Sequence, residues 1–588
     1  MNEPQSIQRR LEVARGDAPA DLILRGARVL DVFQAEFFVA DIAIRDGVIA
    51  GVGQYDRAES VIDVAGRVVT PGLIDAHMHV ESTMLRPSVF APLALSKGTT
   101  GGVLDPHEIA NVLGIDGIRW IMDDAETVPG RWVFAASSCV PASPHETSGA
   151  RLEAEDLAHL FDDPRVVALA ELMNFPGAIA GDPGLLAKLR LGLERRGVVD
   201  GHAPGLSGRS LQAYVGAGVS SDHECTTADE AREKLRAGQM VYIREGSAAR
   251  NLEALLPAVT DHNWWRFGFC TDDRHPDDLA DDGHMDHVVR RAITLGLDPA
   301  RAIAMASHTT ARHYGWRRVG AVAPGFEADL VVFDDERSLR AKQVLVAGRL
   351  VASNGQSEIT PAAAPNPPRL AESVRLRPAF DEAALRIPAG PSRVRVIGML
   401  EGQLLTERQI EAPSVQGDQM VADPTRDLLK LAVIERHGKA AADQTGVGLG
   451  FVRGFGLRRG ALATTVGHDS HNIAVVGACD ADMVVAAREL GRLGGGLCAV
   501  AEGNVLASLP LPIAGLMSDR PADEVIETYR SVLDAAATLG AAQRDPFMPL
   551  SFLPLTVIPH LKLGDRGLVD VDRFEIVPLA ADAPGGVY

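Results

Sequence analysis

Residues 71–82 read PGLIDAHMHVES, an apolar run that ends in two histidines one residue apart. In a β-strand, residues i and i+2 point to the same face, so His77 and His79 can reach one metal ion together. The same pair can also be two hydrogen-bonded polar side chains in a strand. The pattern in the rest of the chain decides between these two interpretations.

Short apolar runs recur after Pro71, and helical segments separate most of them. There are eight: LIDAHMHV (73–80), TTGGVLDPHE (99–108), RWVFAASS (131–138), VVALAELMN (166–174), GVVDGHAPG (197–205), GVSSDHE (218–224), MVYIREG (240–246) and RFGFCTDD (266–273). Strand–helix repetition of this kind predicts an α/β fold, a (β/α)8 TIM-type barrel over residues 71–315. The carboxyl ends of barrel strands build the active site, and several of these runs end in an ionisable residue.

The flanks of the predicted barrel carry a different pattern. Residues 1–70 and 316–360 contain short alternating runs such as DLILRGARVLD (21–31), which predict a small β-sandwich domain built from both flanks. A Pro/Ala-rich stretch at 361–374 predicts a linker. Residues 375–588 mix strand-like and helix-like runs and predict a C-terminal α/β domain.

Composition excludes several classes of protein. The formal net charge is −20, which disfavours binding to nucleic acid or to an anionic membrane. The five cysteines lack C-x-x-C spacing, so we expect no disulfide framework and a cytoplasmic location. The first residues lack the apolar core of a signal peptide, and the chain has no apolar run long enough to span a bilayer.

Candidate metal ligands lie at the ends of several predicted strands. They are four histidines and two carboxylates: His77, His79, Glu171, His202, His223 and Asp272. Imidazole and carboxylate together suit Zn²⁺, Fe²⁺ or Mn²⁺. Six protein ligands are too many for one catalytic metal that keeps an open position. They suit two divalent metal ions that share a bridging carboxylate.

The chain resembles the amidohydrolase superfamily in PGLIDAHMHVES and in VAPGFEADLVVFD (322–334). Within that superfamily, further motifs look like those of the adenine deaminases. These are ALAELMNFPG (168–177), DGHAPGLSG (200–208), SDHECTT (221–227), TTVGHDSHNIAVVG (464–477) and LPLPIAGLMS (509–518). The resemblance spans nearly the whole chain. It implies a binuclear metal site and hydrolytic conversion of adenine to hypoxanthine and ammonia.

The resemblance also implies roles for the candidate ligands. His77, His79 and Asp272 are expected to hold one metal, His202 and His223 the other, and Glu171 to bridge them. Hydantoinase-like and dihydroorotase-like relatives use a carboxylated lysine as the bridge, whereas this chain has no lysine in ALAELMN (168–174). Mn²⁺ or Fe²⁺ is expected from the resemblance, and Zn²⁺ fits the ligand types.

A catalytic mechanism follows as a hypothesis. Two dications make hydroxide available near neutral pH, and Asp272 is expected to act first as base and then as acid. Glu224 is a candidate proton donor to a ring nitrogen, provided that it lies beyond the strand end. Glu81 and Ser82 are expected to bind substrate or support the ligands, and Asp75 to orient the histidine pair.

Several alternatives stay open at this stage. Another amidohydrolase activity, on a different aminopurine or a cyclic amide, needs the same ligands, and a non-catalytic scaffold would need none of them.

The charged run at 274–287 is interpreted as a solvated loop or a mobile lid. The C-terminal loop GHDSHN (467–472) favours a hydrogen-bonded turn over a cap or a third metal site. The expected partners are a small purine base and a second copy of the chain in a homo-oligomer, most simply a dimer.

Overall fold

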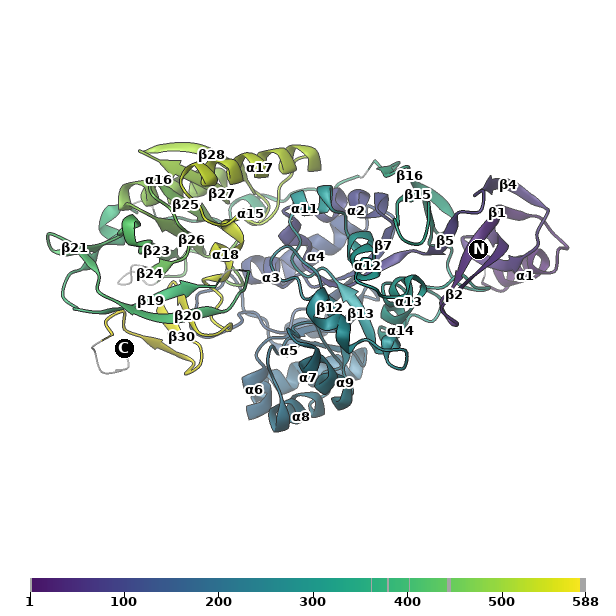
Figure 1. The fold of residues 1–588 in the computed structure, drawn as a ribbon, viewed down its shortest axis with the longest axis horizontal. Coiled ribbons are helices and arrows are strands. Elements are labelled where there is room, and N and C mark those ends of the chain that lie inside the picture. Colours follow the sequence, from purple (N-terminus) through teal and green to yellow (C-terminus); the bar gives the residue numbers. More distant parts are fainter. Residues whose placement is uncertain (1–2, 361, 378–379, 401, 441–445, 582–588) are drawn as a thin grey trace.

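The computed structural model places three parts of the chain side by side, with a sheet from the two flanks at one end, the barrel in the middle and the C-terminal part at the other end (Figure 1). The structure describes residues 3–360, 362–377, 380–400, 402–440 and 446–581. The order of these parts matters for function, because the barrel lies between the other two and the C-terminal part contacts its loops, as Tyr529 contacts His275.

All eight predicted barrel strands are present. They are β6 (Leu73–Met78), β7 (Thr99–Leu104), β8 (Arg131–Ala136), β9 (Val166–Leu172), β10 (Val199–Gly201), β11 (Ser221–Asp222), β12 (Met240–Arg244) and β13 (Phe267–Cys270). Strands β6 to β10 form one parallel sheet and β11 to β13 another. Backbone hydrogen bonds join the two sheets, from Ser220 N to Val199 O (2.9 Å) and from Asp272 N to His77 O (3.1 Å). The prediction of a TIM-type barrel core is therefore confirmed.

Side chains fill the barrel interior. Small residues such as Ala76, Ala135 and Ala168 pack there with Tyr242, and the hydroxyl of Tyr314 donates to Ala76 O (2.9 Å). Layers of inward side chains of this kind leave no pore through a barrel of this size. The helices outside the strands are α2 (Pro87–Ser96), α3 (His107–Leu113), α4 (Ile115–Ala125), α5 (Ala154–Ala158), α6 (Phe175–Ala180), α7 (Pro183–Arg195), α8 (Gly208–Gly216), α9 (Ala228–Ala237), α10 (Leu252–Leu255), α11 (Pro276–Asp281), α12 (Met285–Thr294), α13 (Pro299–Met305) and α14 (His308–His313).

The two flanks of the barrel pair in one nine-stranded sheet. Its strands are β1 (Ala20–Asp31), β2 (Glu36–Arg45), β3 (Val48–Gly53), β4 (Ala58–Asp63), β5 (Val68–Pro71), β14 (Leu330–Phe333), β15 (Ala341–Val346), β16 (Arg349–Ser353) and β17 (Gln356–Ser357). The flanks meet where β14 pairs antiparallel with β5. Helix α1 (Glu3–Ala14) packs against β2 and β3. Strand β5 leads directly into β6, so this sheet fixes where the first barrel strand begins.

The Pro/Ala-rich stretch lies against the barrel. Trp120 Nε1 donates to Pro365 O (3.1 Å), and Ala364 N donates to the Asp124 carboxylate (2.9 Å). Its one helical turn is α15 (Pro368–Ala371), while Pro361 lies outside the described residues. These bonds fix the path along which the chain reaches its C-terminal part.

The C-terminal part is built on an eight-stranded mixed sheet. Its strands, in spatial order, are β20 (Thr406–Glu411), β19 (Val394–Met399), β24 (Val447–Arg453), β23 (Leu429–Ile434), β26 (Ile473–Gly477), β25 (Ala461–Thr464), β27 (Gly496–Ala501) and β28 (Asn504–Pro510). Helices α16 (Asp480–Leu493) and α17 (Ala522–Thr538) pack against it, and α18 (Phe547–Phe552) lies between it and the barrel. The smaller strands are β18 (Ile387–Pro388), β21 (Ser414–Gln416), β22 (Gln419–Val421), β29 (Leu561–Gly564), β30 (Gly567–Asp570) and β31 (Glu575–Val577).

The charged run at 274–287 differs from its prediction as a solvated loop, while its interpretation as a mobile lid stays a prediction. It forms α11 and the start of α12, and most of its polar side chains are buried, including Arg274, His275 and His284. His275 Nδ1 lies 2.8 Å from Asp545 Oδ2 and 2.7 Å from the hydroxyl of Tyr529 on α17. The C-terminal part thus supplies the partners of His275, whereas Arg274 donates to Gly283 O and His284 contacts Thr99 within the barrel.

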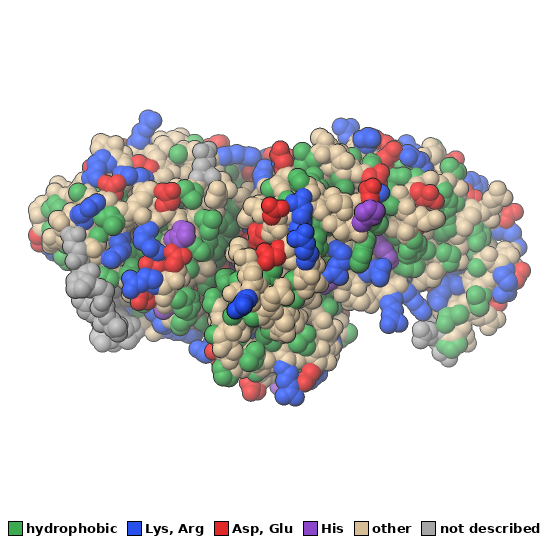
Figure 2. Space-filling view, turned by 60° about the horizontal axis from the view of Figure 1, so that its bottom comes forward, with side chains coloured by type: hydrophobic (Ala, Val, Ile, Leu, Met, Phe, Trp, Pro, Cys, Tyr) green, Lys and Arg blue, Asp and Glu red, His purple; other side chains and the backbone are tan. Residues whose placement is uncertain are grey.

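Acidic and basic side chains are interspersed over the face shown in Figure 2, and no basic stripe stands out on that face. A mixed surface of this kind has no strong local attraction for polyanions. Among the described residues, every helix is too short or too polar to cross a bilayer.

Candidate metal and catalytic site

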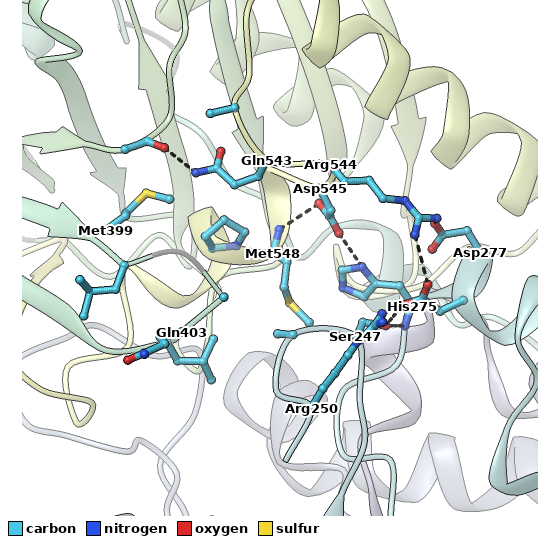
Figure 3. A pocket seen from close by; sticks show the side chains of 18 residues that line it. Ser247, Arg250, His275, Asp277, Met399, Gln403, Gln543, Arg544, Asp545 and Met548 are labelled. Carbon is cyan, nitrogen blue, oxygen red and sulfur yellow. Dashed lines mark hydrogen bonds and ion pairs between the residues drawn. The ribbon is translucent and has the colours of Figure 1, made fainter. Parts of the chain in front are cut away.

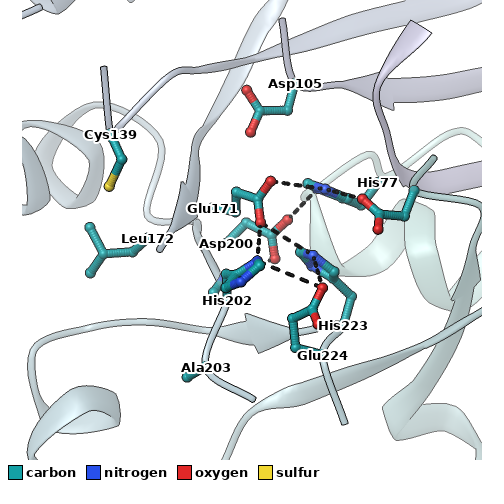
Figure 4. Close-up of polar contacts among 12 residues, drawn as sticks. His77, Asp105, Cys139, Glu171, Leu172, Asp200, His202, Ala203, His223 and Glu224 are labelled. Carbon is teal, nitrogen blue, oxygen red and sulfur yellow. Dashed lines mark hydrogen bonds and ion pairs between the residues drawn. The ribbon is translucent and has the colours of Figure 1, made fainter. Parts of the chain in front are cut away.

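The six candidate ligands converge at the carboxyl ends of the barrel strands. Figure 4 shows four of them, His77, Glu171, His202 and His223. His77 lies one residue before the end of β6, His79 directly follows that strand, and Glu171 lies near the end of β9. His202, His223 and Asp272 follow β10, β11 and β13. All six side chains are buried. Residues almost two hundred positions apart in sequence therefore share one site, as the barrel predicts.

Two sets of ligand atoms form within this site. One set is His77, His79 and Asp272, and the other is Glu171, His202 and His223; within each set the ligand atoms lie within 4.8 Å of one another. Glu171 faces both sets. Its Oε1 lies 3.2 Å from His79 Nε2, and its Oε2 lies 2.6 Å from His202 Nδ1. A carboxylate with its two oxygens turned to different histidine sets is placed to bridge two cations.

The hydrogen bonds of the histidine pair test whether these residues fit a metal. His77 Nδ1 donates to Asp200 Oδ2 (2.8 Å), and His79 Nδ1 donates to Asp105 O (2.9 Å). A neutral imidazole that donates through Nδ1 has a lone pair on Nε2. The two Nε2 atoms are only 3.2 Å apart. Two lone pairs facing each other at this distance repel unless a cation lies beside them, so the pair fits a metal ion.

His223 gives an independent indication. Its side chain is fully buried, and neither ring nitrogen has a hydrogen-bond partner within the described residues. Its Nε2 lies 3.3 Å from Glu171 Oε2 without hydrogen-bond geometry. Buried polar atoms rarely lack partners, and metal coordination is one way to satisfy such an atom.

The electrostatics of the site favour positive charge. Burial by itself lowers the pKa of His77, but Asp200 and the other carboxylates raise this pKa well above its ordinary value. Burial raises the pKa of Glu171, and the charge of His202 outweighs it, so this pKa lies well below its usual range. An environment that draws protons to buried imidazoles also draws metal cations.

Asp272 lies between the histidine pair and an arginine. Its Oδ1 is 3.0 Å from His79 Nε2, and its Oδ2 accepts a hydrogen bond from Arg244 Nη1 (2.5 Å). Burial raises the pKa of Asp272, but the Arg244 charge lowers it well below the usual range. Its φ of +56° lies in the left-handed region, a conformation that Asp tolerates better than most residues and that clusters at functional sites.

Glu224 lies beyond β11, as a role in the site requires. It forms an ion pair with Arg244, with Oε2 at 3.0 Å from Nη2, and its Oε1 is 3.4 Å from His223 Nε2. It lines the catalytic cavity together with Arg244. The arginine therefore couples the two acids that the sequence marks as catalytic, Glu224 and Asp272.

Glu81 and Ser82 lie close to the site, behind the residues that line the catalytic cavity. Glu81 Oε1 accepts a hydrogen bond from Ile109 N (3.1 Å), and burial raises the Glu81 pKa to about 7. Ser82 Oγ donates to Asp273. Contact of either residue with substrate stays a prediction, while support of the first strand-to-helix loop is visible in these bonds.

The groups that orient the histidine pair agree with the expectation only in part, because Asp75 accepts a hydrogen bond from His77 N (3.3 Å) and does not contact the His77 ring. Asp75 accepts a hydrogen bond from the Thr271 hydroxyl (2.6 Å) and lies 3.2 Å from His284 Nε2. Asp200 orients the His77 ring instead. Asp200 lies two residues before His202 in VVDGHAPG, and Arg244 ends the seventh predicted strand. Attention to every ionisable residue at a strand end identifies both of them.

The C-terminal loop GHDSHN forms the predicted hydrogen-bonded turn, in which His471 N donates to Gly467 O (2.6 Å), and the same turn joins the site. His468 Nδ1 and His471 Nε2 both contact the Glu108 carboxylate at the start of α3. Asp469 Oδ1 lies 3.7 Å from His107 Nε2. Glu108 and Asp469 line the catalytic cavity, and so do Leu404, Phe552, Leu555 and Ile558 from the C-terminal part. The C-terminal part thus covers the site with both apolar and ionisable side chains.

A barrel with four histidines and two carboxylates at its strand ends defines a metal-dependent hydrolase of the TIM-barrel class. The amidohydrolase family matches residues 68–351, and the adenine deaminase C-terminal domain matches residues 403–575. The chain belongs to the adenine deaminase family of amidohydrolases, as the resemblance in its motifs predicts.

Known relatives match along almost their full length. The adenine deaminase of Desulfatibacillum aliphaticivorans is 46% identical over 569 residues, which covers 97% of this chain and 99% of that protein. The adenine deaminase of Nitratidesulfovibrio vulgaris (strain DP4) is 48% identical, covering 96% and 97%. That of Methanothrix thermoacetophila is 47% identical, covering 97% and 98%.

Proposed function

We propose that this chain hydrolyses adenine to hypoxanthine and ammonia, with two divalent metal ions in its barrel. The observation that carries the proposal is the position of Glu171 between two histidine sets, 3.2 Å from His79 Nε2 and 2.6 Å from His202 Nδ1. The end-to-end similarity to adenine deaminases supports the substrate.

The proposed ligands of one ion are His77, His79 and Asp272, and those of the other are His202 and His223, with Glu171 shared. Divalent ions held by these residues supply a water that is deprotonated near neutral pH. Imidazole and carboxylate ligands suit Mn²⁺, Fe²⁺ and Zn²⁺. We propose Mn²⁺ or Fe²⁺ as the native ion, because the chain resembles enzymes that use them.

Asp272 is proposed to move the proton. Because Arg244 lowers its pKa, Asp272 is ionised near neutral pH and can accept a proton from the attacking water. It then returns the proton to the amino nitrogen, which leaves as ammonia. Arg244 holds Asp272 Oδ2 at 2.5 Å and so fixes which oxygen faces the reacting atoms.

The purine ring needs a contact that makes its amidine carbon more electrophilic. Glu224 lines the cavity beside His202 and His223, and we propose that it shares a proton with a ring nitrogen. Glu81 and Ser82 are proposed to hold the loop after β6 in the shape that the substrate requires. The bond from Ser82 to Asp273, which lines the cavity, supports this role.

For the whole chain we propose the domain division 1–70 plus 316–360, 71–315, a linker at 361–374, and 375–588. A buried apolar cluster that includes Leu24, Ile42, Val69 and Leu330 supports a β-sandwich for the flanking sheet. All five cysteines are free of disulfides, which supports a cytoplasmic location. A homo-oligomer, most simply a dimer, remains part of the proposal.

The deciding experiment is a substrate screen on protein whose metal content has been measured. Ammonia release is followed with adenine, with other aminopurines and with dihydropyrimidines. Release from adenine and none from dihydropyrimidines is the expected result, and His202→Ala provides the control that loses a metal ligand. Hydrolysis of dihydropyrimidines without deamination of adenine would overturn the proposal in favour of a cyclic-amide hydrolase.

A further inference from the structure

The catalytic cavity is too small for a purine base in this structure. Its volume is about 30 Å³, which has space for no more than a few waters. The barrel ligands form its floor, and Leu404, Phe552, Leu555 and Ile558 cover it from the C-terminal part. A purine base therefore reaches this site only if one of the covering side chains moves.

A much larger cavity lies next to it. This interdomain cavity has a volume of about 640 Å³ and lies between the barrel loops and the C-terminal part (Figure 3). Ser247, Arg250 and His275 lie on its barrel side, and Met399, Gln403 and Met548 on its C-terminal side. Its outer lining residues, such as Arg250 and Gln403, are exposed, whereas His275 and Met548 at its inner end are buried. The cavity thus runs from the surface inward.

The two cavities share one lining residue. Leu404 lines both of them. A small third cavity shares His275 and Met548 with the interdomain cavity and His468 with the catalytic one. The backbone of Leu404 is held, because its carbonyl oxygen accepts a hydrogen bond from the buried Lys562 Nζ (2.9 Å). The Leu404 side chain, and not its backbone, is therefore the part of this residue that can move between the two cavities.

The lining suits an uncharged, flat molecule. Its ionisable groups are already paired: Arg250 with Asp278 (3.1 Å), Arg544 with Asp277 (3.4 Å) and His275 with Asp545 (2.8 Å). Met399, Met548 and Leu404 supply apolar surface, and Gln403 supplies an exposed amide. Thioether and aliphatic surfaces pack on heteroaromatic rings, and an amide can pair with the donor–acceptor edge of an aminopurine.

We propose that the interdomain cavity is an antechamber that binds the neutral aminopurine and passes it to the catalytic cavity through Leu404. This inference rests on the proposed function, because it takes the substrate from it. The antechamber holds the base before the chemical step. A group that blocks the antechamber therefore slows substrate binding but leaves the catalytic residues unchanged.

A reversible plug tests the antechamber. Ala542 lines it on the C-terminal side and is exposed. We replace the exposed Cys479 by Ser, add Ala542→Cys, and label the new thiol with a bulky aromatic thiosulfonate. Labelling is expected to lower kcat/KM for adenine about tenfold or more while kcat changes little, since uniform loss of capture affects kcat/KM first. Dithiothreitol, which removes the label, is expected to restore kcat/KM.

Ala537→Cys in the same background is the matched control. Ala537 is exposed on α17 and lines a separate hollow of about 510 Å³ that shares no lining residue with either cavity. Its labelling is expected to leave kcat/KM unchanged. Ala248→Trp fills the antechamber from the barrel side and is expected to repeat the loss with unchanged metal content.

The outcomes separate the two proposals. If labelled Ala542→Cys keeps kcat/KM within about twofold of the unlabelled protein, the antechamber is overturned and the deaminase remains. If labelled Ala537→Cys loses activity equally, the effect is not specific to the cavity and the antechamber is overturned as well. If the unmodified protein releases no ammonia from adenine, the proposed function itself fails.

Discussion

Asp200 shows how one residue outside the ligand set determines what a ligand can do. Its carboxylate accepts the Nδ1 proton of His77 and so directs the His77 Nε2 lone pair into the site. The isosteric change Asp200→Asn weakens this bond without opening a cavity. We expect metal affinity to fall about 10- to 100-fold, measured as metal retained after dialysis against a graded chelator.

The control for Asp200→Asn is Asp124→Asn. Asp124 is also buried, and it binds Arg86 and the Ser88 amide away from the ligands. We expect this variant to lower thermal stability and to keep its metal. Equal metal loss in the two variants would show that Asp200 acts only through the stability of the fold.

Asp272 is the residue whose loss separates proton transfer from metal binding. Asp272→Asn keeps an oxygen for the metal but cannot accept a proton, so kcat is expected to fall by about 10²- to 10⁴-fold. The measurement pairs kcat with metal content in the same preparation. His202→Ala, by comparison, is expected to lose metal together with activity. Nearly normal kcat in metal-loaded Asp272→Asn would assign the proton transfer to another group.

The strands at whose ends these residues lie were predictable because their sequence pattern is local. VVALAELMN and RFGFCTDD are buried apolar runs that end in acids, and parallel strands in a barrel bring such ends together. Arg244 also ends an apolar run, but the ligand pattern does not single it out, because a guanidinium group is always protonated and does not bind a metal ion. The burial of 274–287 was missed because it depends on partners such as Tyr529, more than two hundred residues away.

Helix α11 is held to α17 by a buried contact that titrates. Burial lowers the pKa of His275, but Asp545 raises it above its ordinary value near 6.5. A raised folded-state pKa contributes stability that is fully present below about pH 6.5 and is lost as pH rises through the folded-state pKa. His275→Gln is therefore expected to lower Tm by a few degrees at pH 6 and by less at pH 9, in thermal unfolding scans.

His313→Gln is the matched control for this pH dependence. Burial lowers the pKa of His313 to about 4, so this histidine is uncharged from pH 6 to pH 9. Its replacement is expected to change Tm by the same amount at both values. A Tm difference for His275→Gln that stays constant between pH 6 and pH 9 would contradict the charged contact with Asp545.

At the scale of the molecule, the site belongs to two parts of the chain. The barrel supplies all six proposed ligands, and the C-terminal part supplies the cover, with His468 and His471 bound to Glu108. The GHDSHN motif contains ionisable residues, but the sequence does not indicate that Glu108 is their partner. A loop has no periodic pattern that predicts which distant residues it contacts. The sequence therefore predicts the floor of the site better than its cover.

The metal ions themselves connect the site to the stability of the whole molecule. When metal is removed, six buried imidazole and carboxylate side chains stay close together without a cation that compensates their lone pairs and negative charges. An ion that binds only the folded protein stabilises it by about 2.7 kcal/mol when the free ion concentration is 100 times the dissociation constant. Exhaustive chelation is therefore expected to abolish ammonia release and to lower Tm by several degrees. Addition of Mn²⁺, Fe²⁺ or Zn²⁺ is expected to restore both, and the ion that restores the highest kcat/KM identifies the best catalytic metal. Retained activity in protein shown to be free of metal would remove the basis of the proposed mechanism, because that mechanism assigns the activation of water to the bound ions.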